Sequence, residues 1–158
     1  MPNQQTRPWR PGERALELAI AISTLIFLAP LLVVIAFLVR LTDGGPSLYG
    51  QERVGMGGRT FRCLKFRTMA VDADAKLSAL LATDAAAADE WSRSHKLKND
   101  PRVTPIGNLL RRSSLDELPQ LLNVLRGEMS LVGPRPIVAS EVERYGIHFR
   151  HYCAVRPG

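Results

Sequence analysis

The sequence of 158 residues predicts an α+β protein, in which a membrane-embedded helical segment precedes a small, mainly helical domain with a short β-hairpin. The first observation is an apolar run without any charge over residues 19–39. The second is a pair of short strand-like runs within residues 47–69, which meet at Gly57 and Gly58. The third is a series of leucine- and alanine-rich stretches after residue 70, separated by proline and glycine as short helices are.

The apolar run is long enough to reach across a bilayer, because a helix rises ~1.5 Å per residue and the hydrocarbon core is ~30 Å thick. Pro30 stands in the middle of this run. It allows a kinked spanning helix, or a helix that breaks at Pro30 and returns to the same membrane face. Basic residues occur on both sides of the run, which draws both ends to the cytoplasm: Arg7, Arg10, Arg14, Arg40, Arg53, Arg59 and Arg62. The residues alone leave both arrangements open.

The elements after the run are set by turn residues. Residues 42–50 carry turn chemistry and mark the exit from the membrane region. The glycines of residues 55–58 predict a hairpin turn rather than a phosphate loop, because no Lys-Ser/Thr pair follows them. Alanine-rich residues 70–91 predict one surface helix, and a basic loop punctuated by prolines follows it. Further helices are expected over 106–125 and 137–152.

The composition points to anionic partners. The formal charge is +6 and the pI is near 9.9, which suits nucleic acid, a phospholipid surface or phosphorylated small molecules. Nucleic acid is not expected, because no helix-turn-helix, zinc-finger or RNP-type aromatic motif is present and the chain has a membrane segment. Cys63 and Cys153 have no paired spacing, and we interpret them as free thiols in a reducing compartment.

Residues 113–125 contain a conflict between local rules. Ser114 and Glu117 fit a capping box, but that register places Pro119 at the fifth helical position, where its missing N–H removes a hydrogen bond. A cap at Asp116 makes Pro119 acceptable and leaves Glu117 without a local role. Such conflicts tend to occur at functional sites, so the acidic pair is a candidate for chemistry.

Cationic residues flank this acidic pair along the chain: Lys65, Arg67, Arg111, Arg112 and Arg135. Solvated surface charge is the usual fate of such side chains. Phosphate recognition is the alternative, because Arg135 stands between Pro134 and Pro136, which fix the backbone around a bidentate donor. Acids near cations also suit a site that holds a divalent ion and a diphosphate together.

Several motifs in one order now make a family resemblance specific. They are the apolar anchor, QERVG, KFRTM, LDELPQL, LRGEMSLVGPRP and VRPG, and they cover nearly the whole chain. The chain resembles the bacterial sugar transferase family, the monotopic polyprenyl-phosphate phosphoglycosyl transferases. The segment between KFRTM and LDELPQL is similar to the undecaprenyl-phosphate galactose phosphotransferase branch.

The resemblance implies an activity. Members transfer a sugar-1-phosphate from a UDP-sugar, here UDP-galactose or UDP-glucose, to undecaprenyl phosphate and release UMP. This is the first membrane step of exopolysaccharide, capsule or O-antigen synthesis, and it uses Mg²⁺ at the cytoplasmic face of the bacterial cytoplasmic membrane. Asp116 would be the nucleophile that forms a covalent intermediate, and Glu117 would ligate Mg²⁺. Arg111 and Arg135 would bind phosphate oxygens, and Lys65 and Arg67 would bind the donor's diphosphate or uridine.

The resemblance also implies a re-entrant anchor over residues 1–41, broken at Pro30, and a catalytic domain over residues 42–158. Family members continue past VRPG, so we expect this chain to be truncated at the C-terminus relative to them. An inactive, truncated membrane scaffold of the same fold is therefore the alternative function. The expected partners are the UDP-sugar, undecaprenyl phosphate and membrane lipids. The sequence leaves open the sugar and the formation of a homo-oligomer.

Overall fold

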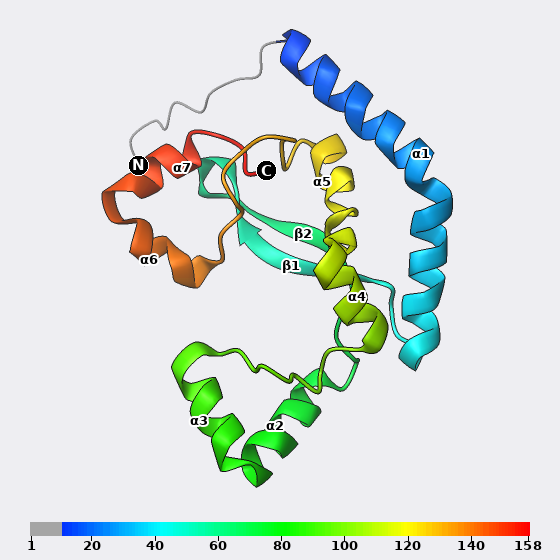
Figure 1. Cartoon of the computed structure of the whole chain (residues 1–158). Helices are drawn as coiled ribbons and strands as arrows, with labels where there is room; N and C mark the ends of the chain where they lie inside the picture. Colours follow the sequence, from blue (N-terminus) through cyan, green and yellow to red (C-terminus); the bar gives the residue numbers. More distant parts are fainter. Residues whose placement is uncertain (1–10) are drawn as a thin grey trace.

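The computed structural model describes residues 11–158 (Figure 1). Its helices are α1 (Pro11–Asp43), α2 (Ala73–Thr83), α3 (Ala85–Ser94), α4 (Pro105–Ser113), α5 (Gln120–Arg126), α6 (Val142–Tyr145) and α7 (Phe149–Cys153). The strands β1 (Leu48–Val54) and β2 (Thr60–Phe66) form one antiparallel hairpin. The expected α+β class, mainly helical with a short hairpin, is confirmed.

Helix α1 runs through Pro30 without ending there, contrary to the expected break. Proline removes one backbone donor, so it bends a helix whose neighbouring turns still hold their hydrogen bonds. Figure 1 shows α1 changing direction along its length. Among the described residues, α1 is the one helix long and apolar enough to cross a membrane. Whether it re-enters or spans remains a prediction.

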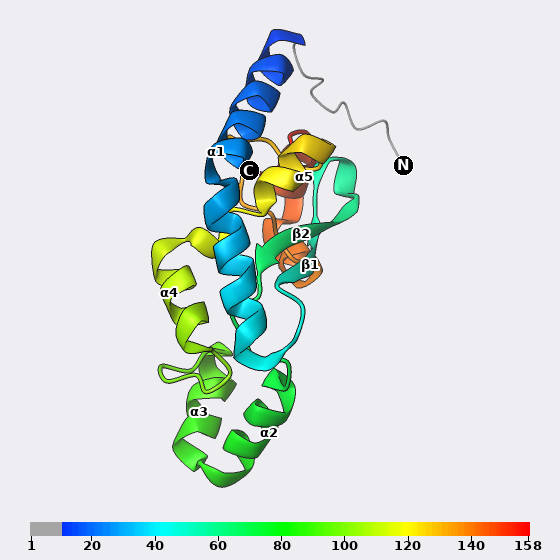
Figure 2. The ribbon, with the colours of Figure 1, turned by 90° about the vertical axis from the view of Figure 1, so that its right-hand side faces the viewer.

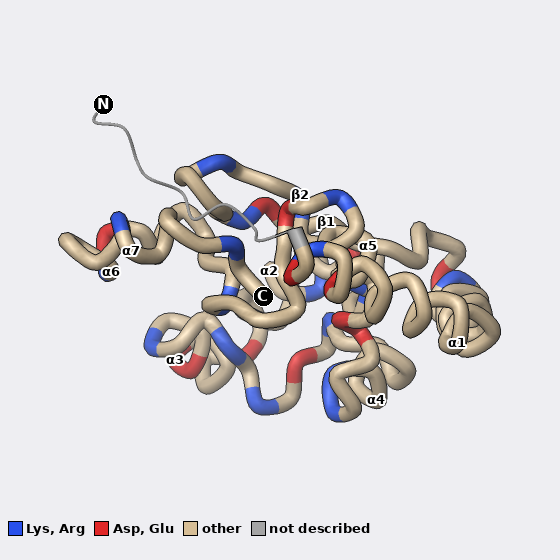
Figure 3. Tube along the Cα trace, turned by 90° about the horizontal axis from the view of Figure 1, so that it is seen from above, with Lys and Arg blue, Asp and Glu red and all other residues tan. Residues whose placement is uncertain are grey.

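Two clusters of buried residues join one side of α1 to the rest of the molecule. The first consists of Ala21, Cys63, Val124 and Met129, and the second of Ile35, Val39, Phe66 and Leu110. The other side of α1 carries large exposed apolar side chains, among them Leu16, Ile26, Phe27, Val33, Phe37 and Leu41. Charged residues of α1, coloured in Figure 3, lie only near its ends, because residues 18–39 carry no charge. The helix therefore has one face for the protein and one for an apolar surrounding.

The hairpin forms as the glycines predict. Leu48 lies opposite Phe66, Val54 lies opposite Thr60, and the connecting turn contains Gly57 at φ 70° and Gly58 at φ 74°. Glycine adopts these positive angles without the steric cost that a Cβ atom would bring. This turn fixes which side chains of β2 face the helices.

Asn123 fastens α5 to the free edge of β2. Its fully buried amide nitrogen donates to the carbonyl of Arg62 at 2.8 Å, and its amide oxygen accepts from the N–H of Leu64 at 2.9 Å. These two backbone groups lie on the same edge of the strand, so the side chain takes the place of a neighbouring strand. Helix α5 is thereby held in register with β2.

The helix expected over residues 70–91 is two helices, α2 and α3. Asp84 is extended between them, and its carboxylate accepts from the N–H groups of Ala86 at 2.9 Å and Ala87 at 3.0 Å. An aspartate that caps a new helix in this way competes with continuation of the old one. Figures 1 and 2 show the α2–α3 pair projecting away from the hairpin. The helix expected over 137–152 is likewise divided, at Gly146 with φ 47°.

Candidate active site

The acidic pair lies on a single 3₁₀ turn, Leu115–Glu117, between α4 and α5. Ser114 ends α4 in the left-handed conformation at φ 57°, and its side chain makes no cap hydrogen bond. Neither expected cap is therefore formed. Pro119 immediately precedes Gln120, the first residue of α5, so its missing N–H costs the helix nothing. The 3₁₀ turn and α5 are separate elements, so the conflict between the cap and Pro119 that one continuous helix would have created does not arise.

The two acids have different surroundings. Asp116 is buried, with 8% of its surface exposed, whereas the Glu117 side chain is 51% exposed. Burial raises the pKa of the Asp116 carboxyl above its ordinary value; Glu117 raises it further, while the positive charges of Lys65 and Arg111 oppose the rise. A single 3₁₀ turn has little dipole to offset this cost of desolvation. One acid is shielded and the other is open to ligands.

Lys65 joins this pair from β2. Its Nζ lies 2.5 Å from Oε1 of Glu117, across 52 residues of sequence. The ammonium group also acts electrostatically on Asp116. The structure thus brings one of the expected phosphate-binding cations to the acids.

Arg111 reaches the same region from α4. Its Nε donates to Oγ1 of the buried Thr68 at 2.8 Å. The close approach of α4 to Thr68 depends on Gly107, where an added Cβ would lie 2.0 Å from the Thr68 carbonyl oxygen. The sequence reasoning missed Thr68 and Gly107; a glycine inside an amphipathic helix was the available signal.

Arg67 has a different position from the one expected of a substrate-binding residue. Its guanidinium makes a bidentate pair with Asp43, with Nη1 2.6 Å from Oδ2, and its Nε donates to the carbonyl of Pro46 at 2.7 Å. The side chain is only 10% exposed. Arg67 therefore joins the end of α1 to the end of β2, which is a structural task.

Arg135 is exposed on a loop beside the other end of the hairpin. The loop is fixed because the N–H of Val54 donates to the carbonyl of Ile137 at 2.8 Å and Arg53 donates to the carbonyl of Pro136 at 3.1 Å. Within residues 11–158, no hydrogen bond or ion pair joins Arg135 to Asp116 or Glu117. The structure therefore does not bring Arg135 into direct contact with the acids.

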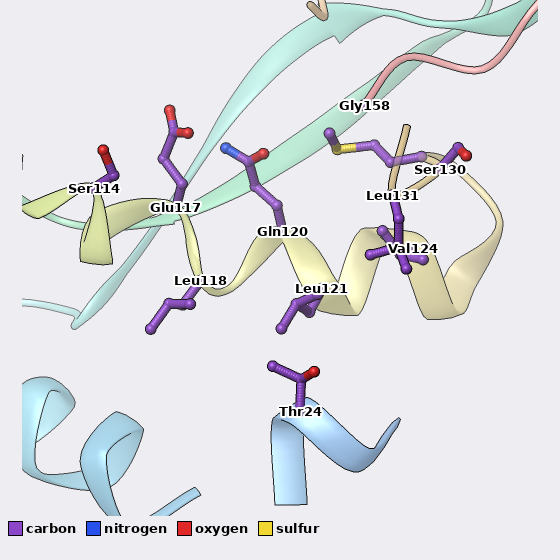
Figure 4. Close-up of a pocket in the computed structure, with 11 residues that line it drawn as sticks. Thr24, Ser114, Glu117, Leu118, Gln120, Leu121, Val124, Ser130, Leu131 and Gly158 are labelled. Atoms are coloured by element: carbon purple, nitrogen blue, oxygen red, sulfur yellow. The ribbon is translucent and has the colours of Figure 1, made fainter. Parts of the chain in front are cut away.

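Two cavities border this group of residues. One, of about 290 Å³, lies between α5 and α1 and includes Glu117 (Figure 4). The other, of about 950 Å³, is lined by residues 95–105, Met69, Asn108 and Arg111. The second carries several basic side chains, and the first is walled largely by apolar ones.

The acids offer oxygen ligands for a metal ion. No group of three or more His, Cys, Asp or Glu side chains suited to a metal occurs in the described part of the chain. Mg²⁺ needs no such cluster, since it is usually held by one or two carboxylates together with substrate phosphates and water. The half-exposed Glu117 beside Asp116 fits that manner of binding.

Comparison with known proteins places the chain in a protein family. A family profile described as bacterial sugar transferase matches residues 9–158. The undecaprenyl-phosphate galactose phosphotransferase of Salmonella typhimurium is 48% identical over 156 residues, 99% of this chain and 33% of the relative. The UDP-galactose-lipid carrier transferase of Erwinia amylovora is 51% identical over 146 residues, 92% of this chain and 30% of the relative. The exopolysaccharide production protein ExoY of Sinorhizobium fredii is 48% identical over 159 residues, 98% of this chain and 70% of the relative.

Proposed function

This chain belongs to the bacterial sugar transferase family, and from that membership we propose that it transfers a sugar-1-phosphate from a UDP-sugar to undecaprenyl phosphate and releases UMP. The donor is UDP-galactose or UDP-glucose. The observation that carries the proposal is the buried Asp116 beside the half-exposed Glu117. The positive charges of Lys65 and Arg111 lie close enough to act electrostatically on Asp116. This arrangement offers a nucleophile together with positive charge for phosphate oxygens.

Asp116 is the nucleophile in the proposed reaction. Its carboxylate oxygen attacks the sugar-linked phosphorus of the donor, and the bond from that phosphorus to the bridging oxygen breaks with UMP as the leaving group. An oxygen of the acceptor's phosphate then attacks the same phosphorus and releases Asp116. The acceptor phosphate is already charged, with a second pKa of about 6 as in other phosphate monoesters, and needs no general base. The buried position of Asp116 supports this role, since a partly desolvated carboxylate is a stronger nucleophile.

Glu117 and the neighbouring cations bind the charged parts of the substrates. When Mg²⁺ is bound, it would offset the charge of the donor's diphosphate. Glu117 would hold that ion, and the ammonium of Lys65, now paired with Glu117, would turn to a phosphate oxygen. Arg111 would bind the donor's phosphates from the cavity that it lines with residues 95–105. Arg135 would approach a phosphate only with substrate bound, and Arg67 keeps its structural pair.

The membrane helix is proposed to be re-entrant, with the domain on the cytoplasmic face. The polar domain holds both ends of α1: Arg14 donates to the carbonyls of Val124 at 2.9 Å and Leu125 at 3.1 Å, and Asp43 pairs with Arg67. A helix that spans the bilayer would put its two ends on opposite faces, so a domain on one face could keep the contacts of only one end without burying polar groups in the hydrocarbon. The contacts support a monotopic arrangement in which α1 enters and leaves on one face.

Radiolabelled UDP-sugars, incubated with the membrane-inserted chain and undecaprenyl phosphate, test the proposal. We expect label in the lipid phase, and a burst of UMP without acceptor that is stoichiometric with active enzyme. Asp116→Asn should abolish the burst while the UDP-sugar still binds. Intersecting double-reciprocal lines without a burst would replace the covalent mechanism by direct attack. No transfer from UDP-galactose, UDP-glucose or other UDP-sugars by a folded chain would leave the scaffold alternative.

A further inference from the structure

We propose that the cavity between α1 and α5 binds the first isoprene units of the acceptor, those next to its phosphate. The membrane helix itself then forms one wall of the acceptor site. This inference rests on the proposed transfer to a polyprenyl phosphate. It adds the place where the lipid lies and the residues that contact it.

The cavity extends from Glu117, the neighbour of the proposed nucleophile, to Thr24 on the membrane helix. Glu117 and Gln120 lie at its polar end, and Leu118, Leu121 and Thr24 line its apolar part. In Figure 4 the side chains of Leu118 and Leu121 point toward Thr24 on α1, whereas Glu117 and Gln120 point away from that helix. A lipid phosphate has the same two parts, a charged head and an apolar chain. The phosphate of the lipid would lie beside Glu117 and the Mg²⁺ that Glu117 would hold. The apolar chain of the lipid would contact Leu118 and Leu121.

The apolar end of the cavity adjoins the exposed apolar side of α1. Ile20 and Phe27, which are 45% and 82% exposed, stand four residues before and three residues after Thr24. Residues at these spacings are neighbours on one side of a helix. A lipid in the bilayer would therefore enter sideways past these two side chains.

The walls of the cavity are tied together by the N-terminal part of α1. Glu17 accepts hydrogen bonds from Oγ of Ser130 and from the N–H of Leu131, the latter at 3.3 Å. Ser130 and Leu131 also line the cavity. The membrane helix thus holds the loop that closes the site opposite α5, and the cavity is formed before any ligand arrives.

The second cavity suits the other substrate. It is lined by the basic residues His95, Lys96, Lys98 and Arg111 and by the ion pair of Arg102 with Asp100, and no residue of α1 lines it. The phosphates of a soluble nucleotide bind to such cations, and the nucleotide has no long apolar chain that would need an apolar wall. The division leaves the cavity beside α1 to the lipid.

The size of the cavity limits what it holds. At about 290 Å³ it is near the lower end of ligand pockets, which run from about 300 to 1,000 Å³. It has room for part of a long polyprenyl chain, so the rest must stay in the bilayer. Isoprenoid phosphates of a few units should therefore bind nearly as well as undecaprenyl phosphate in detergent.

Two tryptophan variants on α1 test the location. Thr24→Trp fills the cavity and should raise the KM for polyprenyl phosphate about tenfold or more, with the KM for UDP-sugar changed less than about twofold. Ile26→Trp adds the same side chain at an exposed position two residues away and should leave both values near wild type. An unchanged acceptor KM in Thr24→Trp, an equal rise in both KM values, or the same effect from Ile26→Trp would overturn the proposal.

Photolabelling of the unmodified chain gives a test that needs neither turnover nor a folded variant. The probe is a short isoprenoid phosphate with a diazirine in its first unit. We expect label on the peptides that contain Thr24 and Leu121, competed by unlabelled polyprenyl phosphate and not by the matching alcohol. Label spread along the exposed face of α1 without competition would mean general lipid contact and would overturn the proposal. If no UDP-sugar is turned over, the proposed transfer fails while this labelling still decides the cavity.

Discussion

At the scale of single residues, Asp116 is buried, although the proposed mechanism requires its carboxyl to be ionised. Burial raises the pKa of its carboxyl above 3.8, so the folded state favours the protonated form. A raised carboxyl pKa contributes stability below the ordinary value, and this is lost as the pH rises through the folded-state pKa. At neutral pH the charged side chain therefore opposes folding.

Removing that charge should stabilise the protein. We expect Asp116→Asn to raise the unfolding temperature by about 2–4 °C at pH 7, the shift for one kcal/mol in a chain of this size. The gain should shrink as the pH falls toward 3.8, where wild type also carries a protonated group. Thermal unfolding in detergent from pH 4 to 8 measures this. A variant that is less stable than wild type at pH 7 would show that the ionised carboxylate is well satisfied.

A substitution of Glu117 distinguishes a role in Mg²⁺ binding from a role limited to its ion pair with Lys65. Glu117→Gln keeps the size of the side chain and removes its charge, so the Mg²⁺ affinity and kcat should fall together, by about tenfold or more. Titration of Mg²⁺ against turnover should show partial rescue at high concentration. Wild-type Mg²⁺ dependence in the variant would limit Glu117 to its pair with Lys65. Glu52→Gln, a change of the same kind on β1, is the matched control.

At the scale of elements, α4 can present Arg111 only because Gly107 lets the helix touch Thr68. Gly107→Ala would place a Cβ atom 2.0 Å from the Thr68 carbonyl, so α4 must shift and the Arg111–Thr68 hydrogen bond must lengthen. Overpacking of this kind costs about 1–3 kcal/mol of stability, and a 1 Å displacement of a binding group can cost about a hundredfold in rate.

The matched control for this helix is Gly12→Ala on α1, where an added Cβ meets nothing within 4 Å. We expect Gly107→Ala to lower kcat/KM for the UDP-sugar and the unfolding temperature, and Gly12→Ala to lower neither. Kinetics and thermal unfolding of the two variants decide this. Wild-type kinetics in Gly107→Ala would mean that the position of Arg111 does not matter for donor binding.

At the scale of the whole molecule, the contacts at both ends of α1 predict a one-sided topology. Tags at residues 1 and 158 should both be protected in sealed spheroplasts and both accessible in inverted vesicles. Pro30→Leu restores the missing backbone donor, so the helix should straighten and some molecules should span. Opposite accessibility of the two tags in wild type would contradict the re-entrant arrangement.

Features that depend only on neighbouring residues could be predicted from the amino-acid order. The uncharged anchor, the hairpin turn at Gly57 and Gly58, and the candidate pair Asp116 and Glu117 could all be found from local rules. The same rules misplaced helix ends: Asp84 divides one expected helix, and a 3₁₀ turn replaces the expected helical cap at Ser114. Competing caps have similar energies, and packing selects among them.

Contacts between residues far apart in the sequence could not be predicted, because they depend on how the elements pack. Lys65 reaches Glu117 across 52 residues, whereas Arg67, two positions further along, turns to Asp43 and leaves the acids. Residues two apart on a strand share a face, so alternation alone would group Lys65 with Arg67. Strand β2 ends at Phe66, however, and Arg67 lies beyond it, where the end of α1 supplies Asp43 as its partner. The burial of Asp116, and the cavity that extends from Glu117 to α1, likewise exist only once α4, α5 and α1 are packed together. Local sequence can name reactive groups, but packing sets their burial, charge and access.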